Sequence, residues 1–195
     1  MIENPGAADV SNEKVNLLER WIFVLLYSDS MSIINGRIRF TNYLFLILKK
    51  FDPEAFEAAE FYPHYFGPNS KFVAKTIGDM FSNGLIEVEQ KNQEINFSLS
   101  ELGKVKAEDI VKAVDQDTIS KISEFKQSNN SISLDEFIIC IDKKYPEYTK
   151  IEESIIETVD LSQCEKIDDG PGFVSPIDPN EDIIIDEKTY LRLFL

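Results

Sequence analysis

Histidine and cysteine are nearly absent from this sequence, and their scarcity excludes most protein metal centres. The 195-residue chain contains one histidine, His64, and two cysteines, Cys140 and Cys164. These residues are too few and too widely spaced to indicate a zinc site or a disulfide framework. Cys140 lies in the apolar run 137–141, where we expect it to be a small buried hydrophobic side chain. The sequence therefore predicts neither a metal nor a cofactor.

Motifs for catalysis are also lacking. Gly67-Pro68 is not followed by the further glycines and the lysine of a phosphate-binding loop. A calcium loop is excluded because the stretch that begins at Asp178 has Ile183 where the loop requires glycine. His64 could act as a general base, but no serine or cysteine in a Gly-x-Ser-x-Gly setting accompanies it. We therefore expect a protein that is not an enzyme, with His64 in a structural role.

Long hydrophobic runs are missing as well. The longest, Trp21–Tyr27, is far shorter than the roughly 20 apolar residues that a membrane-spanning helix needs. The first residues carry neither the basic nor the apolar region of a secretory signal. We therefore expect a cytoplasmic protein with no membrane partner.

Basic residues are outnumbered, with 20 Lys and Arg against 35 Asp and Glu, which gives a formal net charge of −15. Residues 151–195 alone hold 12 acids and 3 bases. A surface this acidic repels a phosphate backbone, so the charge does not favour DNA as the partner. It favours a basic protein partner, or it serves simply to keep the protein soluble, which is the commoner role of such charge.

What the sequence does contain is a clear helical pattern with one β-hairpin. Apolar residues recur at helical spacing over about 13–27, 39–50 and 71–82. Asn69 or Ser70 is predicted to cap the third of these helices. Strict alternation of apolar and polar residues then predicts a hairpin over about 86–99. Helices followed by a hairpin in this order are typical of a winged helix-turn-helix core, which makes the predicted fold class α+β and mainly α-helical.

The pattern divides the chain into four predicted segments. They are a flexible arm over residues 1–11, a winged-helix domain over 12–103, a helical extension packed on it over 104–160, and an acidic loop with an apolar C-terminal element over 161–195. Within the extension we expect a break at 127–131, a helix that begins at Ser133, and a last helix over about 150–159.

The segment Phe61–Ser70 resembles a motif of the YwgA-like family of winged-helix proteins, in which an aromatic-Pro-x-x-aromatic-Gly-Pro-x-Ser segment precedes the third helix. Four further pieces agree in order: Gly36–Phe40, Asn83–Ile86, Leu99–Gly103 and Tyr145–Glu147. The resemblance implies a winged-helix fold and a DNA-binding or regulatory role, and related folds serve as antitoxins and adaptors. The chain departs from the family in its base-poor third helix and in its acidic segment beyond Val159.

If the third helix entered a major groove, phosphate and base contacts would come from that helix, the start of the second helix and the tip of the hairpin. The candidate residues are Arg37, Arg39, Asn69, Ser70, Lys71, Lys75 and Lys91. Three lysines neutralise few phosphates, and the helix has no arginine for bidentate guanine contact. We therefore favour solvated lysines over DNA contact.

Aromatic and apolar residues supply a second set of candidates, for contact with a protein partner. They are Tyr62, His64 and Tyr65 before the third helix, and Tyr190, Leu193 and Phe194 at the C-terminal end. The aromatic cluster around His64 is also explained by core packing beneath the third helix, which we favour. The sequence predicts a winged-helix regulator or adaptor that acts through protein contacts. The alternative is a DNA-binding regulator or antitoxin-like protein, in which a homodimer would double the weak lysine contacts.

Overall fold

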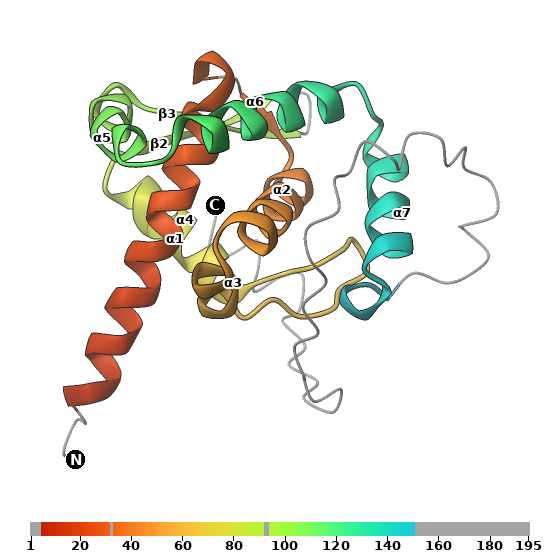
Figure 1. The fold of residues 1–195 in the computed structure, drawn as a ribbon, viewed down its shortest axis with the longest axis horizontal. Coiled ribbons are helices and arrows are strands. Elements are labelled where there is room, and N and C mark those ends of the chain that lie inside the picture. The colour runs from red at the N-terminus through yellow and green to blue at the C-terminus, as the bar shows by residue number, and fades with distance from the viewer. Residues whose placement is uncertain (1–4, 32, 92–93, 151–195) are drawn as a thin grey trace.

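The computed structural model describes residues 5–31, 33–91 and 94–150 (Figure 1). This part of the chain forms seven α-helices, one short 3-10 helix and a three-stranded antiparallel sheet with strand order β1-β3-β2. The predicted α+β class with mainly α-helical content is therefore confirmed. The predicted helix over 150–159 and the predicted segment 161–195 lie outside the described residues.

Helix α1 (Pro5–Met31) runs through the middle of the fold and packs against α3, α4, α5 and α6. Leu18, Ile22 and Leu25 are fully buried on its inner face. The predicted flexible arm is wrong for residues 5–11, because α1 begins at Pro5, a residue suited to the first helical position. Figure 1 shows these first turns projecting beyond the rest of the molecule.

Helix α2 (Arg37–Phe51) lies inside the fold, and all of its residues from Phe40 to Lys49 are buried. Helix α3 (Pro53–Ala59) follows at once and was not predicted. Asp52 joins the two helices to α1. One of its carboxylate oxygens accepts a bond of 3.0 Å from the Ala55 amide, and the other accepts a bond of 2.6 Å from Trp21 Nε1.

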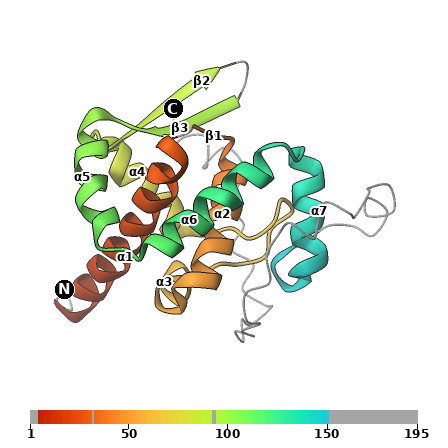
Figure 2. The same ribbon diagram turned by 45° about the horizontal axis from the view of Figure 1, so that its top comes forward.

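Helix α4 (Lys71–Ser82) has the predicted bounds, with Ser70 as its N-cap and Gly84 in the left-handed conformation behind it. The predicted hairpin is confirmed as β2 (Ile86–Lys91) and β3 (Glu94–Leu99). Figure 2 shows this hairpin extending beyond the helices. The two-residue strand β1 (Ile34–Asn35) adds the third member of the sheet by pairing with β3.

The helical extension consists of α5 (Glu101–Lys112), α6 (Gln116–Asn130), α7 (Leu134–Lys144) and the 3-10 helix η1 (Pro146–Tyr148). Ser133 caps α7 in a capping box, as its predicted position implies. The predicted break at 127–131 is wrong over most of its length. Helix α6 continues to Asn130, and Arg39 of α2 donates hydrogen bonds there to the carbonyl groups of Asn129 and Ile132.

Cys140 is buried on α7, as predicted, but it is disulfide-bonded, which corrects the expectation that the cysteines form no disulfide. Spacing in the sequence is a poor guide here, because the fold decides which Cβ atoms meet. The other cysteine, Cys164, lies outside the described residues.

Of the helices that the structure describes, none combines the length and the apolar character that crossing a bilayer requires.

Candidate macromolecular interface

A closed loop over residues 61–70 connects α3 to α4 and reaches across to the end of α7 (Figure 1). Tyr62 and Asn69 close it like a short antiparallel ladder. The Tyr62 amide donates to the Asn69 carbonyl at 2.8 Å, and the Asn69 amide donates to the Tyr62 carbonyl at 3.0 Å. Inside the loop, the Gly67 amide donates to the His64 carbonyl at 3.2 Å. The loop therefore has a defined shape of its own.

Asn42 of α2 fixes this loop from below. Its side chain is fully buried, and Nδ2 donates to the Phe66 carbonyl at 3.1 Å. Gly67 has a φ of +94°, and a Cβ atom there would lie 2.7 Å from Asn42 Oδ1. Only glycine combines that backbone conformation with so close an approach. The loop and the core helix are thus built to fit each other.

The loop divides its aromatic residues between core and solvent. Phe61 is buried, and its ring packs against Phe45 at a centroid distance of 5.1 Å. Tyr65 and Phe66, in contrast, are 65% and 51% exposed. Core packing of the cluster is therefore the right interpretation for Phe61 and the wrong one for Tyr65 and Phe66. We refer to Tyr65 and Phe66 as the aromatic tip, an exposed apolar surface held on a fixed backbone.

His64 joins this loop to the end of the helical extension. It forms a parallel bridge with Thr149, in which the Lys150 amide donates to the His64 carbonyl at 3.2 Å. The imidazole is half-buried, and its ring centroid lies 6.0 Å from that of Tyr65 and 5.8 Å from that of Phe66. Burial, with a contribution from the Lys150 charge, lowers the pKa of His64 below its usual 6.5.

This lowered pKa makes stability depend on pH. The unfolded chain takes up the His64 proton at a higher pH than the folded chain, so the free energy of unfolding falls with acidification. The contribution of His64 is complete above about pH 6.5 and is lost as the pH falls through its folded pKa. We expect H64Q to flatten the dependence between about pH 7.5 and 5, measured by urea unfolding. If the free energy of unfolding depended on pH equally in the wild type and in H64Q, the assignment to His64 would be contradicted.

The outward face of α4 offers little to a phosphate backbone. Ser70 is buried, with its hydroxyl accepting from the Val73 amide and donating to the Ala59 carbonyl. Asn69 Oδ1 accepts from the Ser70 amide at 2.8 Å. Lys71 and Lys75 are exposed, but Lys75 Nζ lies 2.9 Å from the Asp79 carboxylate. Among the candidate residues of this segment, Lys71 and Lys75 alone keep a charged group in solvent.

The two candidate arginines lie at the start of α2. The Arg39 guanidinium donates to the Asn129 carbonyl at 2.8 Å and to the Ile132 carbonyl at 2.7 Å. It also lies 5.4 Å from the Phe137 ring centroid, so it serves the contact between α2 and the extension rather than an outer surface. Arg37 is partly exposed. Lys91 ends β2, and its side chain lies outside what the structure describes.

The hairpin adds negative charge where a winged helix would meet the DNA backbone. Glu87 and Glu89 alternate along β2, so they lie on one face of the sheet, and both are exposed. They are paired across the ladder with Ser98 and Asn96, which carry no charge. Carboxylates in this position repel phosphate groups.

Three further large apolar side chains are exposed, and the sequence does not predict their exposure. Phe81 lies in the last turn of α4 and is half-exposed. Leu102 and Val105 of α5 are exposed too, one helical turn apart. Helical periodicity marks apolar residues without saying whether a neighbouring element covers them.

The remaining candidates, Tyr190, Leu193 and Phe194, lie outside the described residues. Within residues 5–31, 33–91 and 94–150, no three His, Cys, Asp or Glu side chains gather as they would to hold a metal ion.

The sequence matches no protein-family model, and no curated protein or solved structure is significantly similar to it. The resemblance to the YwgA-like family therefore stays a prediction from its motifs.

Proposed function

We propose that the chain is a winged-helix binding module that acts through protein contacts and uses the aromatic tip to bind a basic protein. The order helix, strand, helices, hairpin supports the winged-helix assignment, as does the pairing of β1 with β3. This support for the winged-helix assignment does not depend on the family resemblance.

One observation favours a protein partner over DNA. Most of the polar groups that could contact a duplex already have partners within the protein, and nearby carboxylates would repel the phosphates. Arg39 and Ser70 make internal hydrogen bonds, and Lys75 lies against Asp79. The hairpin presents Glu87 and Glu89 to solvent. Affinity for DNA comes mainly from neutralised phosphates, and this surface neutralises few of them.

The aromatic tip suits a protein partner for two reasons. Exposed Tyr and Phe side chains supply large contact areas, and aromatic residues are enriched at the centres of protein interfaces. The backbone beneath Tyr65 and Phe66 is already fixed by Asn42 and by the Tyr62–Asn69 pair, so binding orders little additional chain. A net charge of −15 favours encounter with a basic partner.

A labelled duplex titrated at about 50 and 200 mM salt tests the exclusion of DNA. We expect no affinity tighter than the roughly micromolar range of non-specific binding. Nanomolar affinity that falls steeply with salt, and that is abolished in K71E/K75E, would instead establish the DNA-binding alternative. That alternative is favoured by one feature, the exposed Lys71 in the first turn of α4.

Quantitative capture from the native host tests the aromatic tip. We expect a set of basic proteins to be retained by the wild type and reduced at least about tenfold with Y65A/F66A, a loss of roughly 1.4 kcal/mol. The matched control is L102A/V105A, which removes two similarly exposed apolar side chains from α5. Retention that is insensitive to the tip variant, or equally sensitive to both, would refute this docking surface.

A further inference from the structure

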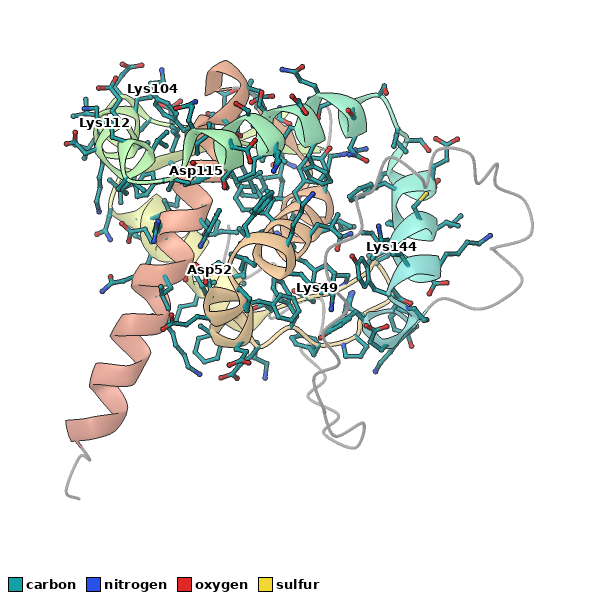
Figure 3. All side chains as sticks on the ribbon, in the orientation of Figure 1. Lys49, Asp52, Lys104, Lys112, Asp115 and Lys144 are labelled. Carbon is teal, nitrogen blue, oxygen red and sulfur yellow. The ribbon has the colours of Figure 1, made fainter. Side chains whose placement is uncertain are left out.

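Two lysines lie close together between the ends of α2 and α7. Lys49 Nζ lies 5.1 Å from the ring centroid of Tyr145, and Lys144 Nζ lies 5.9 Å from the same ring. Figure 3 labels both lysines, one on each of these helices. A single aromatic ring therefore has an ammonium group from each helix beside it, which is a favourable setting for both cations.

Two more lysines belong to the same place. Lys50 is partly buried, and that burial lowers its pKa, with the charges of Lys121 on α6 and Lys144 lowering it further. Carboxylates act on these lysines too. Asp117 lies 2.5 Å from Lys121, and the charges of Asp115 and Glu124 also raise the pKa of Lys121. The charge of Glu147 acts on the pKa of Lys49 in the opposite sense to burial. We call Lys49, Lys50, Lys121 and Lys144 the lysine cluster. Its members come from three helices, so the fold assembles it.

The acidic end of the chain begins next to this cluster. Lys49 Nζ lies 5.3 Å from the ring centroid of Tyr148, only two residues before the last described residue, Lys150. The residues that follow, 151–195, hold 12 acids and 3 bases, with Glu152 and Glu153 among the first. Two residues of extended chain span about 7 Å. Carboxylates of this segment are thus tethered within a short reach of the lysines.

Helix α7 buries apolar side chains beyond those that it packs on the core. Ile138 and Ile139 are buried, although they do not belong to the hydrophobic core cluster that contains Phe137, Cys140 and Ile141. The helix therefore has a second apolar face besides the one that packs on the core. The acidic segment matches it in composition, because it includes the apolar run 183–185.

We propose that residues 151–195 bind the lysine cluster of their own chain, with carboxylates against the ammonium groups and the apolar run against the second face of α7. The two signs of charge are complementary, and the tether makes the local concentration of the segment high, on the order of millimolar. This inference is independent of the proposed function, because it concerns neither the aromatic tip nor the surface of α4.

Zero-length cross-linking of the full chain at low concentration tests it. A water-soluble carbodiimide activates a carboxylate, and a lysine amine in contact with it then forms an amide as the reagent leaves as a urea. We expect peptide mapping of the monomer to show links from Lys50, Lys121 and Lys144 to acids of residues 151–195. The yield of these cross-links should fall several-fold in 1 M NaCl, where the screening length is about 3 Å.

Lys71 and Lys75 provide the matched control, since they are exposed lysines on α4. Lys75 is expected to link to Asp79, and neither lysine is expected to link to residues 151–195. Links distributed equally over Lys71, Lys75 and the cluster would overturn the proposal. Links found only in covalent dimers would also overturn it and would make a second copy the occupant. Absence of links, together with protection of the cluster from acetylation by added polyphosphate, would assign the cluster to an external polyanion instead.

Hydrogen exchange gives a second readout on the intact protein. We expect K50Q/K144Q to accelerate amide exchange over residues 151–195 by about tenfold, with an unchanged rate in K71Q/K75Q. Exchange in the core strands β2 and β3 reports whether each variant stays folded. Unchanged exchange of residues 151–195 in a folded K50Q/K144Q protein would rule out the lysine cluster as their binding site.

Discussion

Replacement of Gly103 by alanine is expected to destabilise the protein by about 3 kcal/mol. A Cβ atom on Gly103 would lie 1.9 Å from the Leu85 carbonyl oxygen, which is far inside van der Waals contact. That oxygen is backbone, and it also accepts a hydrogen bond from the Ser100 amide, so it cannot move alone. Helix α5 would have to shift away from Leu85, which lies between α4 and β2. Urea denaturation measures the loss.

The informative result is whether G103A lowers or raises the free energy of unfolding. Alanine in a helix is ordinarily favoured over glycine by about 1 kcal/mol, so G103A would stabilise α5 if helical propensity decided the outcome. G84A is the control, because Gly84 has a φ of +67° but no atom within 4 Å of a new Cβ. It should cost about 1 kcal/mol from backbone strain alone. A G103A protein as stable as the wild type would show that α5 does not pack so closely on Leu85.

Substitution of Lys126 by methionine is expected to cost about 3–5 kcal/mol, the usual penalty for removing one partner of a buried ion pair. Lys126 is fully buried, and its ammonium lies 2.6 Å from Asp29 Oδ1. It also donates to the carbonyl groups of Leu25 and Ser28 near the end of α1. Methionine fills a similar volume, but it leaves the Asp29 carboxylate and both carbonyls without this donor.

Lys106 offers a close comparison, because it too pairs with an acid of α1. Lys106 Nζ lies 2.6 Å from Glu19 Oε1, but both side chains are partly exposed. K106M should therefore cost no more than about 1 kcal/mol. Adding D29N to K126M should recover part of the larger loss, since it removes the buried charge that Lys126 balanced. Equal losses in K126M and K106M, measured by thermal or urea unfolding, would refute the special role of Lys126.

Local signals in the sequence predicted most of the fold. The bounds of α4 follow from Ser70 and Gly84, two residues whose capping preferences act within a few positions of the helix ends. Alternation predicted the hairpin in the same way. Helix α3 also had a local signal, because Asp52 followed by Pro53 combines an N-cap residue with a preferred first helical residue. The helix predicted over 39–50 ends just before this pair, which in the structure begins α3.

Features that depend on distant contacts could not be predicted. Strand β1 has two residues and exists because β3 provides an edge for it, about 60 residues further along the chain. The sequence does not show whether Arg39 would contact phosphate or carbonyl groups. Its actual acceptors are carbonyl groups 90 and 93 residues further along the chain. The backbone that carries the aromatic tip likewise depends on a tertiary contact, the close approach of Gly67 to Asn42. The candidate surface is thus a product of tertiary structure.

The bonds of Arg39 also bear on how the chain can be divided. Its guanidinium closes the end of α6 and lies against Phe137, so the interior of the first hundred residues contains a cation whose acceptors belong to the last fifty that the structure describes. A chain that ends after the hairpin would leave the Arg39 guanidinium without these acceptors. It would also expose Tyr43, whose ring packs against Phe137, to solvent. We therefore expect the two pieces on either side of the predicted boundary near residue 103 to unfold as one cooperative unit.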